Sequence, residues 1–237
     1  MGRSTPLAEP VGLDAIRTLS VEDAGHRLGP GYGAGLARLP AGGQVFRGLP
    51  FDLGPGGGDR FVLVDRPLQL PLDPAGAASH VVVAHLCDAW RDDDGRRPVG
   101  LAPGHVVPIG EPLARYAVTA TDGARHEVTI RRRFEIADGI LGWGSMAFAA
   151  VPHLENEVID WRGPHAAQVP GRYAPPGQSG SLTIMPGTYG GNQVGVTDFI
   201  PSATDDLVLW LHAIRLPPGS TPDRHAKARP LNPTSTI

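Results

Sequence analysis

One short segment, residues 79–90, collects side chains that could do chemistry. It reads SHVVVAHLCDAW, so a β-branched run ends in His85, Cys87, Asp88 and Trp90. On a strand, His85 and Cys87 would share one face and could begin a zinc site. A Cys–His nucleophilic pair is a second candidate, which needs an exposed thiol and a separately placed base.

The sequence pattern does not supply the further residues that a zinc site or a nucleophilic pair would need. Structural zinc needs two further ligands, but no C-x-x-C or H-x₃-H pattern accompanies the cluster. We therefore interpret His85, Asp88, Arg132 and His212 as polar side chains of a packed core. The alternative is a metal-dependent hydrolase that uses His85, Asp88 and other histidines with a divalent metal, whose full ligand set is unknown.

Two further patterns approach catalytic motifs. The stretch GQSGS at 177–181 is close to the G-x-S-x-G nucleophile elbow, but it ends in Ser181 and precedes a strand-like run where a helix is required. The stretch GPGGGDR at 54–60 lacks the strand before it and the helix after it that a phosphate-binding loop needs. We expect no catalytic residue from either and predict a loop at 54–60.

Loop-like sequence over residues 139–168 is a better candidate for ligand contact. Aromatic rings flanked by polar groups can stack on the C–H groups of sugars while the polar groups fix orientation. The alternative is that Trp161 only plugs the end of a sandwich. Together with one tryptophan from the first segment, the candidate ligand patch is Trp90, Trp143, Asp160, Trp161, Arg162 and His165.

Composition predicts the class of fold that positions these residues. The 237-residue chain is 41% hydrophobic and 19% charged, so it can bury a core. Its 32 glycines and 25 prolines are spread between short apolar runs, which is typical of all-β proteins with many turns. Strands are expected at 44–47, 60–65, 68–72, 80–87, 114–120, 124–136, 181–185, 194–200 and 207–216.

Charge and cysteine content restrict the partners and the compartment. The formal net charge is -3 with no extended basic face, so we expect no nucleic-acid partner. No 18-residue apolar segment and no signal-peptide pattern are present, so we expect no membrane partner. With a single cysteine, the chain fits a reducing compartment, and we predict a cytoplasmic protein.

The chain divides into three parts. Residues 1–43 form an irregular segment with one short helix, capped by Ser20 with Asp23 at its third position and followed by a GPGYGAG loop. Residues 44–216 form the β-sandwich domain. Residues 217–237 are polar and rich in proline, which indicates a flexible tail or linker.

Hydrophobic alternation gives one hairpin in detail. A three-residue loop from Thr121 to Gly123 would pair Val118 with His126, Tyr116 with Val128 and Ala114 with Ile130. Gly123 would then take the left-handed position of a bulge.

The same alternation points Arg132 inward. Because an unpaired buried charge costs several kcal/mol, Arg132 needs Asp88 or Asp160 as an ion-pair partner, a bulge that turns it outward, or a ligand. The runs HVVVAHLC and LVLWLHAIRL are apolar on both faces, which predicts central strands carrying His85 and His212.

Several motifs in order resemble a known family. VFRGLPFDLGP, RFVLVD, HVVVAHLCDAW, ARYAVTATDGARHEVTIRRRFEI and VIDW resemble the galactose-binding-like β-sandwich modules of bacterial hydrolases over roughly residues 44–216, although Thr121 stands where the family hairpin has tyrosine. With GWGSMAFAAVPH and DWRGPH, the chain is also similar to the region preceding the catalytic domain of PHP-like metallohydrolases of the CehA/McbA type. The catalytic histidine motifs of those enzymes are not found here, so no catalytic residue is carried over.

We therefore predict an all-β protein, an antiparallel jelly-roll β-sandwich of galactose-binding-like type with an irregular N-terminal segment. The expected function is a non-catalytic accessory module of a hydrolase that binds carbohydrate or mediates protein contacts, so its partners would be a glycan or a hydrolase catalytic domain. No cofactor is expected. The resemblance allows a structural calcium, with ligands unknown.

Overall fold

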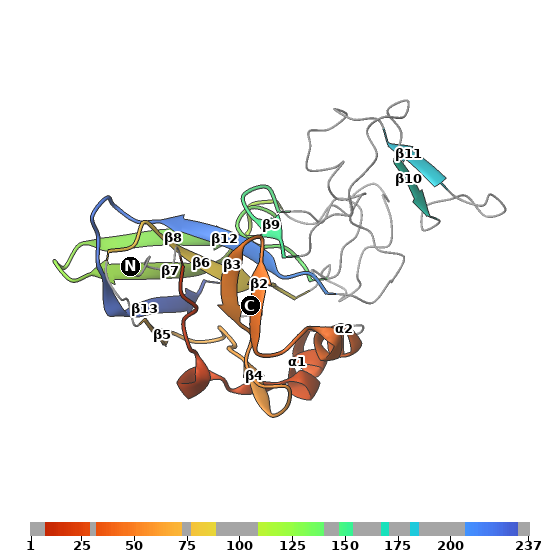
Figure 1. Ribbon diagram of the computed structural model, residues 1–237, viewed down its shortest axis with the longest axis horizontal. Helices are drawn as coiled ribbons and strands as arrows, with labels where there is room; N and C mark the ends of the chain where they lie inside the picture. The colour runs from red at the N-terminus through yellow and green to blue at the C-terminus, as the bar shows by residue number, and fades with distance from the viewer. Residues whose placement is uncertain are drawn as a thin grey trace, which may run out of the picture.

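The computed structural model describes residues 8–28, 32–72, 77–88, 109–139, 147–153, 167–170, 181–184 and 207–231. Within these ranges the chain is mostly strand, and every ladder between named strands is antiparallel (Figure 1). This confirms the all-β, antiparallel part of the predicted fold. In chain order the elements are η1 (Asp14–Ile16), β1 (Leu19–Ser20), α1 (Val21–Leu28), α2 (Tyr32–Arg38), β2 (Gly43–Phe46), β3 (Leu49–Asp52), β4 (Asp59–Phe61), β5 (Leu68–Pro71), β6 (His80–His85), β7 (Pro112–Ala120), β8 (Arg125–Arg131), β9 (Val151–Pro152), β10 (Ala167–Pro170), β11 (Ser181–Ile184), β12 (Trp210–Arg215) and β13 (Pro222–Pro230).

Two sheets pack face to face. One has the order β5-β13-β7-β8 and the other the order β6-β12-β9. Their shared core contains Val83 and Ile214 from the second sheet, in one cluster with Leu113, Ile130 and Ala228 of the first. Burial of these apolar side chains, at about 25 cal/mol per Å² removed from water, is the main force that holds the two layers together.

The second sheet is covered on its other face as well. Val82 and Ala84 of β6 and Leu211 of β12 pack against a cluster from the N-terminal segment that includes Tyr32 and Leu36. The two predicted central strands pair directly with each other, from Trp210 opposite His85 to Arg215 opposite His80. The prediction of a central strand is confirmed for β12, whereas β6 is at the edge of the described sheet, although apolar clusters cover both of its faces.

The N-terminal segment is more regular than predicted. Helix α1 begins after Ser20, whose hydroxyl accepts a hydrogen bond from the Asp23 backbone N–H at 3.0 Å, as the predicted cap requires. The expected GPGYGAG loop is wrong from Tyr32 onward, because these residues form α2. A Cβ on Gly25 would lie only 2.7 Å from Gly33 Cα, so these two glycines permit α1 and α2 to cross closely. In the sequence alone, the same glycines indicate the end of a helix.

The β7–β8 hairpin has the predicted register. Val118 lies opposite His126, and Tyr116 opposite Val128. Gly123 has a φ of +86°, the left-handed conformation expected of it. The strand is shorter than predicted, however, because β8 ends at Arg131 and residues 133–135 form a turn.

Residues 222–230 correct the predicted flexible tail over 217–237. They form β13, which pairs with β5 on one side and with β7 on the other. Ala226 and Ala228 point into the core, while His225, Lys227 and Arg229 are exposed. Buried and exposed residues alternate along this strand, but the buried ones are small alanines that add little hydrophobicity to the sequence. The segment therefore resembles a polar linker.

Three short antiparallel pairs complete the described strands: β1 with β4, β2 with β3, and β10 with β11. The predicted strand at 60–65 is reduced to β4, the one at 181–185 is present as β11, and the one at 194–200 lies outside the described residues. The glycine-rich stretch at 54–58 is the predicted loop, between β3 and β4. No helix in the described part of the chain is long and apolar enough to cross a membrane.

Candidate functional site

The first group of functional candidates surrounds Arg132, where β8 ends. Its backbone N–H donates to the Glu111 carbonyl at 2.8 Å, and the next residue, Arg133, has a φ of +63°. This left-handed residue turns the chain while Arg132 continues the inward-facing row of Val128 and Ile130. Strand termination therefore places a guanidinium inside the protein.

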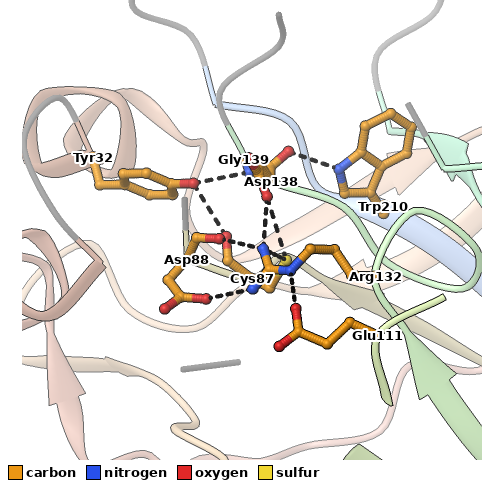
Figure 2. Close-up of polar contacts among 8 residues, drawn as sticks. All are labelled: Tyr32, Cys87, Asp88, Glu111, Arg132, Asp138, Gly139 and Trp210. Atoms are coloured by element: carbon orange, nitrogen blue, oxygen red, sulfur yellow. Dashed lines mark hydrogen bonds and ion pairs between the residues drawn. The ribbon is translucent and has the colours of Figure 1, made fainter. Parts of the chain in front are cut away.

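Five acceptors surround the Arg132 guanidinium, whose side chain is 2% exposed (Figure 2). It donates to Asp88 Oδ1 at 3.1 Å, Glu111 Oε2 at 2.9 Å and Asp138 Oδ1 at 2.9 Å. It also donates to the Asp88 carbonyl at 2.8 Å and contacts Cys87 Sγ at 3.3 Å. We call Arg132 and these four partner residues, Cys87, Asp88, Glu111 and Asp138, the arginine cluster.

Of the three alternatives for Arg132, the structure has the ion pair, with Asp88 among its partners. Asp160, the other expected partner, lies outside the described residues. Burial works to lower the Arg132 pKa, but the negative charges of Asp138 and Asp88, with the hydrogen bond to Glu111, raise it above its usual range. The guanidinium is therefore a permanent charge that organises this part of the interior.

Cys87 is sealed within the same cluster. It is fully buried, and burial raises the pKa of its thiol well above the usual range. Its Sγ lies 3.7 Å from Asp138 Oδ1, and no hydrogen bond joins it to His85 among the described contacts. A protonated thiol without access to solvent is a poor nucleophile, so the side chain serves packing.

The arginine cluster is tied to the layers above and below it. The Tyr32 hydroxyl of α2 donates to the Cys87 carbonyl at 3.1 Å and accepts from the Gly139 N–H at 3.3 Å (Figure 2). Trp210 Nε1 of β12 donates to the Asp138 carbonyl at 3.0 Å. These bonds join the helical layer to both sheets through one polar centre.

His85 belongs to a separate buried polar contact. Its Nε2 lies 2.8 Å from the Glu135 carbonyl, so it must donate there, and Nδ1 then accepts from the Tyr116 hydroxyl at 3.2 Å. Burial lowers the pKa of His85 to about 4, which keeps the ring neutral at pH 7. His212 Nδ1 lies 2.8 Å from the Ala149 carbonyl. Both histidines are thus polar side chains of the core.

The described residues bring together no metal-binding group of three or more His, Cys, Asp or Glu side chains. The ligand patch predicted from sequence, and most of the GQSGS stretch, fall in the remaining part of the chain. The patch residues outside the described ranges are Trp90, Trp143, Asp160, Trp161, Arg162 and His165.

A second candidate site lies on the outer face of the four-stranded sheet. Strand pairing places Gln69, Lys227, Ala117 and Glu127 in one row across β5, β13, β7 and β8. These side chains line a hollow of about 280 Å³. We call it the cationic groove, and its lining is Pro67, Leu68, Gln69, Arg115, Ala117, Arg125, Glu127, Lys227, Ala228 and Arg229.

Glu127 joins two arginines of the groove. Its carboxylate accepts from Arg115 Nη1 at 2.9 Å and from Arg125 Nη2 at 2.5 Å. Partial desolvation works to raise the pKa of Glu127, but the hydrogen bond from Arg125 and the charge of Arg115 hold it below its usual range. The carboxylate is consequently ionised and held between two guanidinium groups.

Arg115 leaves a donor unused. Its Nε is buried and has no hydrogen-bond partner among the described residues. A buried donor without an acceptor costs about 1–3 kcal/mol, so an acceptor oxygen brought to this atom would gain that energy. The alternation that gave the hairpin register also places Arg115 and Glu127 outward, whereas Lys227 and Arg229 were hidden in the predicted tail.

Comparison with known proteins adds no relative. No family model, no curated protein and no solved structure matches the chain.

Proposed function

We propose that this chain is a non-catalytic β-sandwich module, of the jelly-roll, galactose-binding-like type suggested by its sequence, that binds carbohydrate in the cationic groove. It would serve as an accessory module of a hydrolase. The observation that supports this proposal is the groove itself, a lined hollow of about 280 Å³ on a regular sheet face. This volume is close to the lower limit of roughly 300 Å³ for small-molecule sites, so it suits part of an extended ligand.

The floor of the groove is rigid. Ala117 is 4% exposed and lies between Tyr116 and Val118, whose side chains belong to the inner core. Hydrogen bonds from β13 and β8 hold β7 on both sides. A site on paired strands loses little conformational entropy when a ligand binds, which favours recognition by a preformed surface.

The described polar centres favour binding over chemistry. A substrate has no access to Arg132 or Cys87, because their side chains are buried. In the groove, the Glu127 carboxylate is engaged by two arginines, which makes it a weak proton acceptor. Both ring nitrogens of His85 are hydrogen-bonded, so the hydrolase alternative gains no support from this residue.

Affinity electrophoresis of the intact chain through gels containing different polysaccharides tests the proposal. We expect at least one polysaccharide to retard the protein, and Lys227→Gln to reduce that retardation. Trp161→Ala is the matched test of the sequence-predicted patch: abolished retardation with an unchanged melting temperature would move the sugar contact there. A chain that no neutral or acidic polysaccharide retards would overturn the proposed function.

A further inference from the structure

We propose that the ligand of the cationic groove is an acidic polysaccharide, whose carboxylate or sulfate groups are held by Arg115, Lys227 and Arg229. This inference rests on the proposed carbohydrate-binding function and adds the ligand class. Charge is the first observation behind it. The groove is lined by four cationic side chains and one carboxylate, whereas the whole chain has a formal net charge of -3.

The distribution of charge over the outer face is uneven. His225 is exposed on the same side of β13 as Lys227 and Arg229, one alternation earlier. Asp223 is exposed at the beginning of that strand, two positions further from the groove. A concentration of positive charge on a chain of opposite net sign attracts anions locally and is expected to be screened by salt.

Arg115 supplies the most specific contact. Glu127 engages its Nη1, and its buried Nε has no described acceptor. An oxyanion on the Nε side of the guanidinium would accept from Nε and the adjacent Nη2 together, in the two-bond geometry that guanidinium groups form with carboxylates. The Glu127 carboxylate, held at Nη1, would lie close to that anionic group and repel it.

Lys227 and Arg229 extend the site along the strand. They are exposed, lie two residues apart on β13, and have no ion-pair partner among the described residues. Residues two apart on a strand project to the same side with a separation of about 6.5–7 Å. Such a row suits a polymer with repeated anionic groups better than a single small anion.

Isothermal titration calorimetry of the intact chain at low salt tests this inference with three polymers: polygalacturonate, dextran sulfate and neutral dextran. We expect binding to polygalacturonate or dextran sulfate but not to dextran, and weaker binding as salt is added. The two acidic polymers distinguish carboxylate from sulfate as the recognised group.

Variants locate the contact. We expect Arg115→Gln and Lys227→Gln each to weaken binding by about 3- to 10-fold, the range of an exposed or charge-assisted contact. Glu127→Gln should strengthen binding several-fold, because it removes a neighbouring negative charge that repels the ligand. Arg27→Gln is the matched control: it removes one exposed positive charge from α1, and affinity should be unchanged.

The outcomes separate this inference from the proposed function. Binding to dextran but to neither acidic polymer would overturn the ligand class and leave a carbohydrate-binding module. Equal losses in Lys227→Gln and Arg27→Gln would show that net charge, and not the groove, decides binding. Equally tight capture of single-stranded DNA would show non-specific electrostatics and would also overturn the inference. Melting temperatures of all variants guard against loss of folding.

Discussion

The two faces of the four-stranded sheet use the same side-chain types in opposite ways. On the inner side, Arg132 is 2% exposed and faces acceptors on all its nitrogen atoms. On the outer side, Arg115 is 34% exposed, has one carboxylate partner and leaves its Nε without a described acceptor. All the nitrogen atoms of Arg132 thus donate to groups of the protein itself, while Arg115 keeps a donor that a ligand could use.

The difference teaches that an arginine–carboxylate pair acquires its role from its surroundings. Inside, desolvation makes every missing partner costly, so a retained charge must be fully satisfied. Outside, water and salt weaken each pair to about 0–1 kcal/mol, so pairs can open and re-form around a ligand. The predictions that follow test this contrast from the stronger side to the weaker.

Replacement of the inner arginine should have the largest effect. Arg132→Met leaves the Asp88, Glu111 and Asp138 side chains without their shared cation, and breaking a buried ion pair in this way costs about 3–5 kcal/mol. Equilibrium urea denaturation measures the loss.

Arg115→Met is the matched outer variant and should lose no more than about 1 kcal/mol. Similar losses in the two variants would remove the distinction between the faces.

Acid should destabilise the protein through the core before it affects the groove. The folded pKa of His85, about 4, lies below its unfolded value of 6.5, so the unfolded chain binds the proton first. This contribution to stability is complete above pH 6.5 and is lost as pH falls toward 4. Between pH 7 and pH 5 the loss should be about 2 kcal/mol.

Unfolding curves at the two pH values check this expectation, with His85→Gln as the control that should lack most of the dependence. Below pH 5 a further loss is expected, because the Arg131 hydrogen bonds lower the pKa of Glu135 although its own burial works to raise it. A wild-type protein equally stable at pH 7 and pH 5 would contradict the described environment of His85.

Removal of one hydroxyl should loosen the connection between the helical layer and the arginine cluster. Tyr32→Phe deletes two hydrogen bonds, to the Cys87 carbonyl and from the Gly139 N–H, without changing the ring. We expect a loss of about 1 kcal/mol, measured by denaturation. An unchanged free energy of unfolding would show that the two bonds carry no net stability.

The smallest effect is expected at the exposed edge of the groove. Arg125→Gln removes one of the two partners of Glu127, but Arg125 is 54% exposed, so the free energy of unfolding should change by less than about 0.5 kcal/mol. Calorimetric melting detects a larger change. A loss above 1 kcal/mol would mean that the outer charges hold the fold as the inner ones do.

Local patterns explain which parts of this architecture the sequence predicted. The hairpin register followed from alternation and from one glycine, and the covering of β6 and β12 on both faces followed from apolar residues at alternate positions. The cap at Ser20 required only a motif of four residues. Each of these signals lies within a short stretch of chain.

The missed features depend on partners far away in sequence. The alternation identified Asp88 as a partner of Arg132, but nothing in it marks Glu111, 21 residues away in the chain, as another. Helix α2 contains glycines that normally break helices, and packing against α1 overrides that preference. The inward side chains of β13 in the core clusters are Ala226 and Ala228, where its neighbours bury larger side chains, so its hydrophobic alternation is faint.

The position of β13 also bears on how the protein can be made. Strands β5 and β7 are not hydrogen-bonded to each other, and β13, which begins about 150 residues after β5 and about 100 after β7, lies between them. During synthesis both strands leave the ribosome before β13 does, so the edges that will pair with β13 have no hydrogen-bond partner until β13 has been made. Closure of so long a loop slows folding and leaves unpaired strands exposed meanwhile. Production at low temperature or with chaperones should therefore raise the yield of correctly assembled protein.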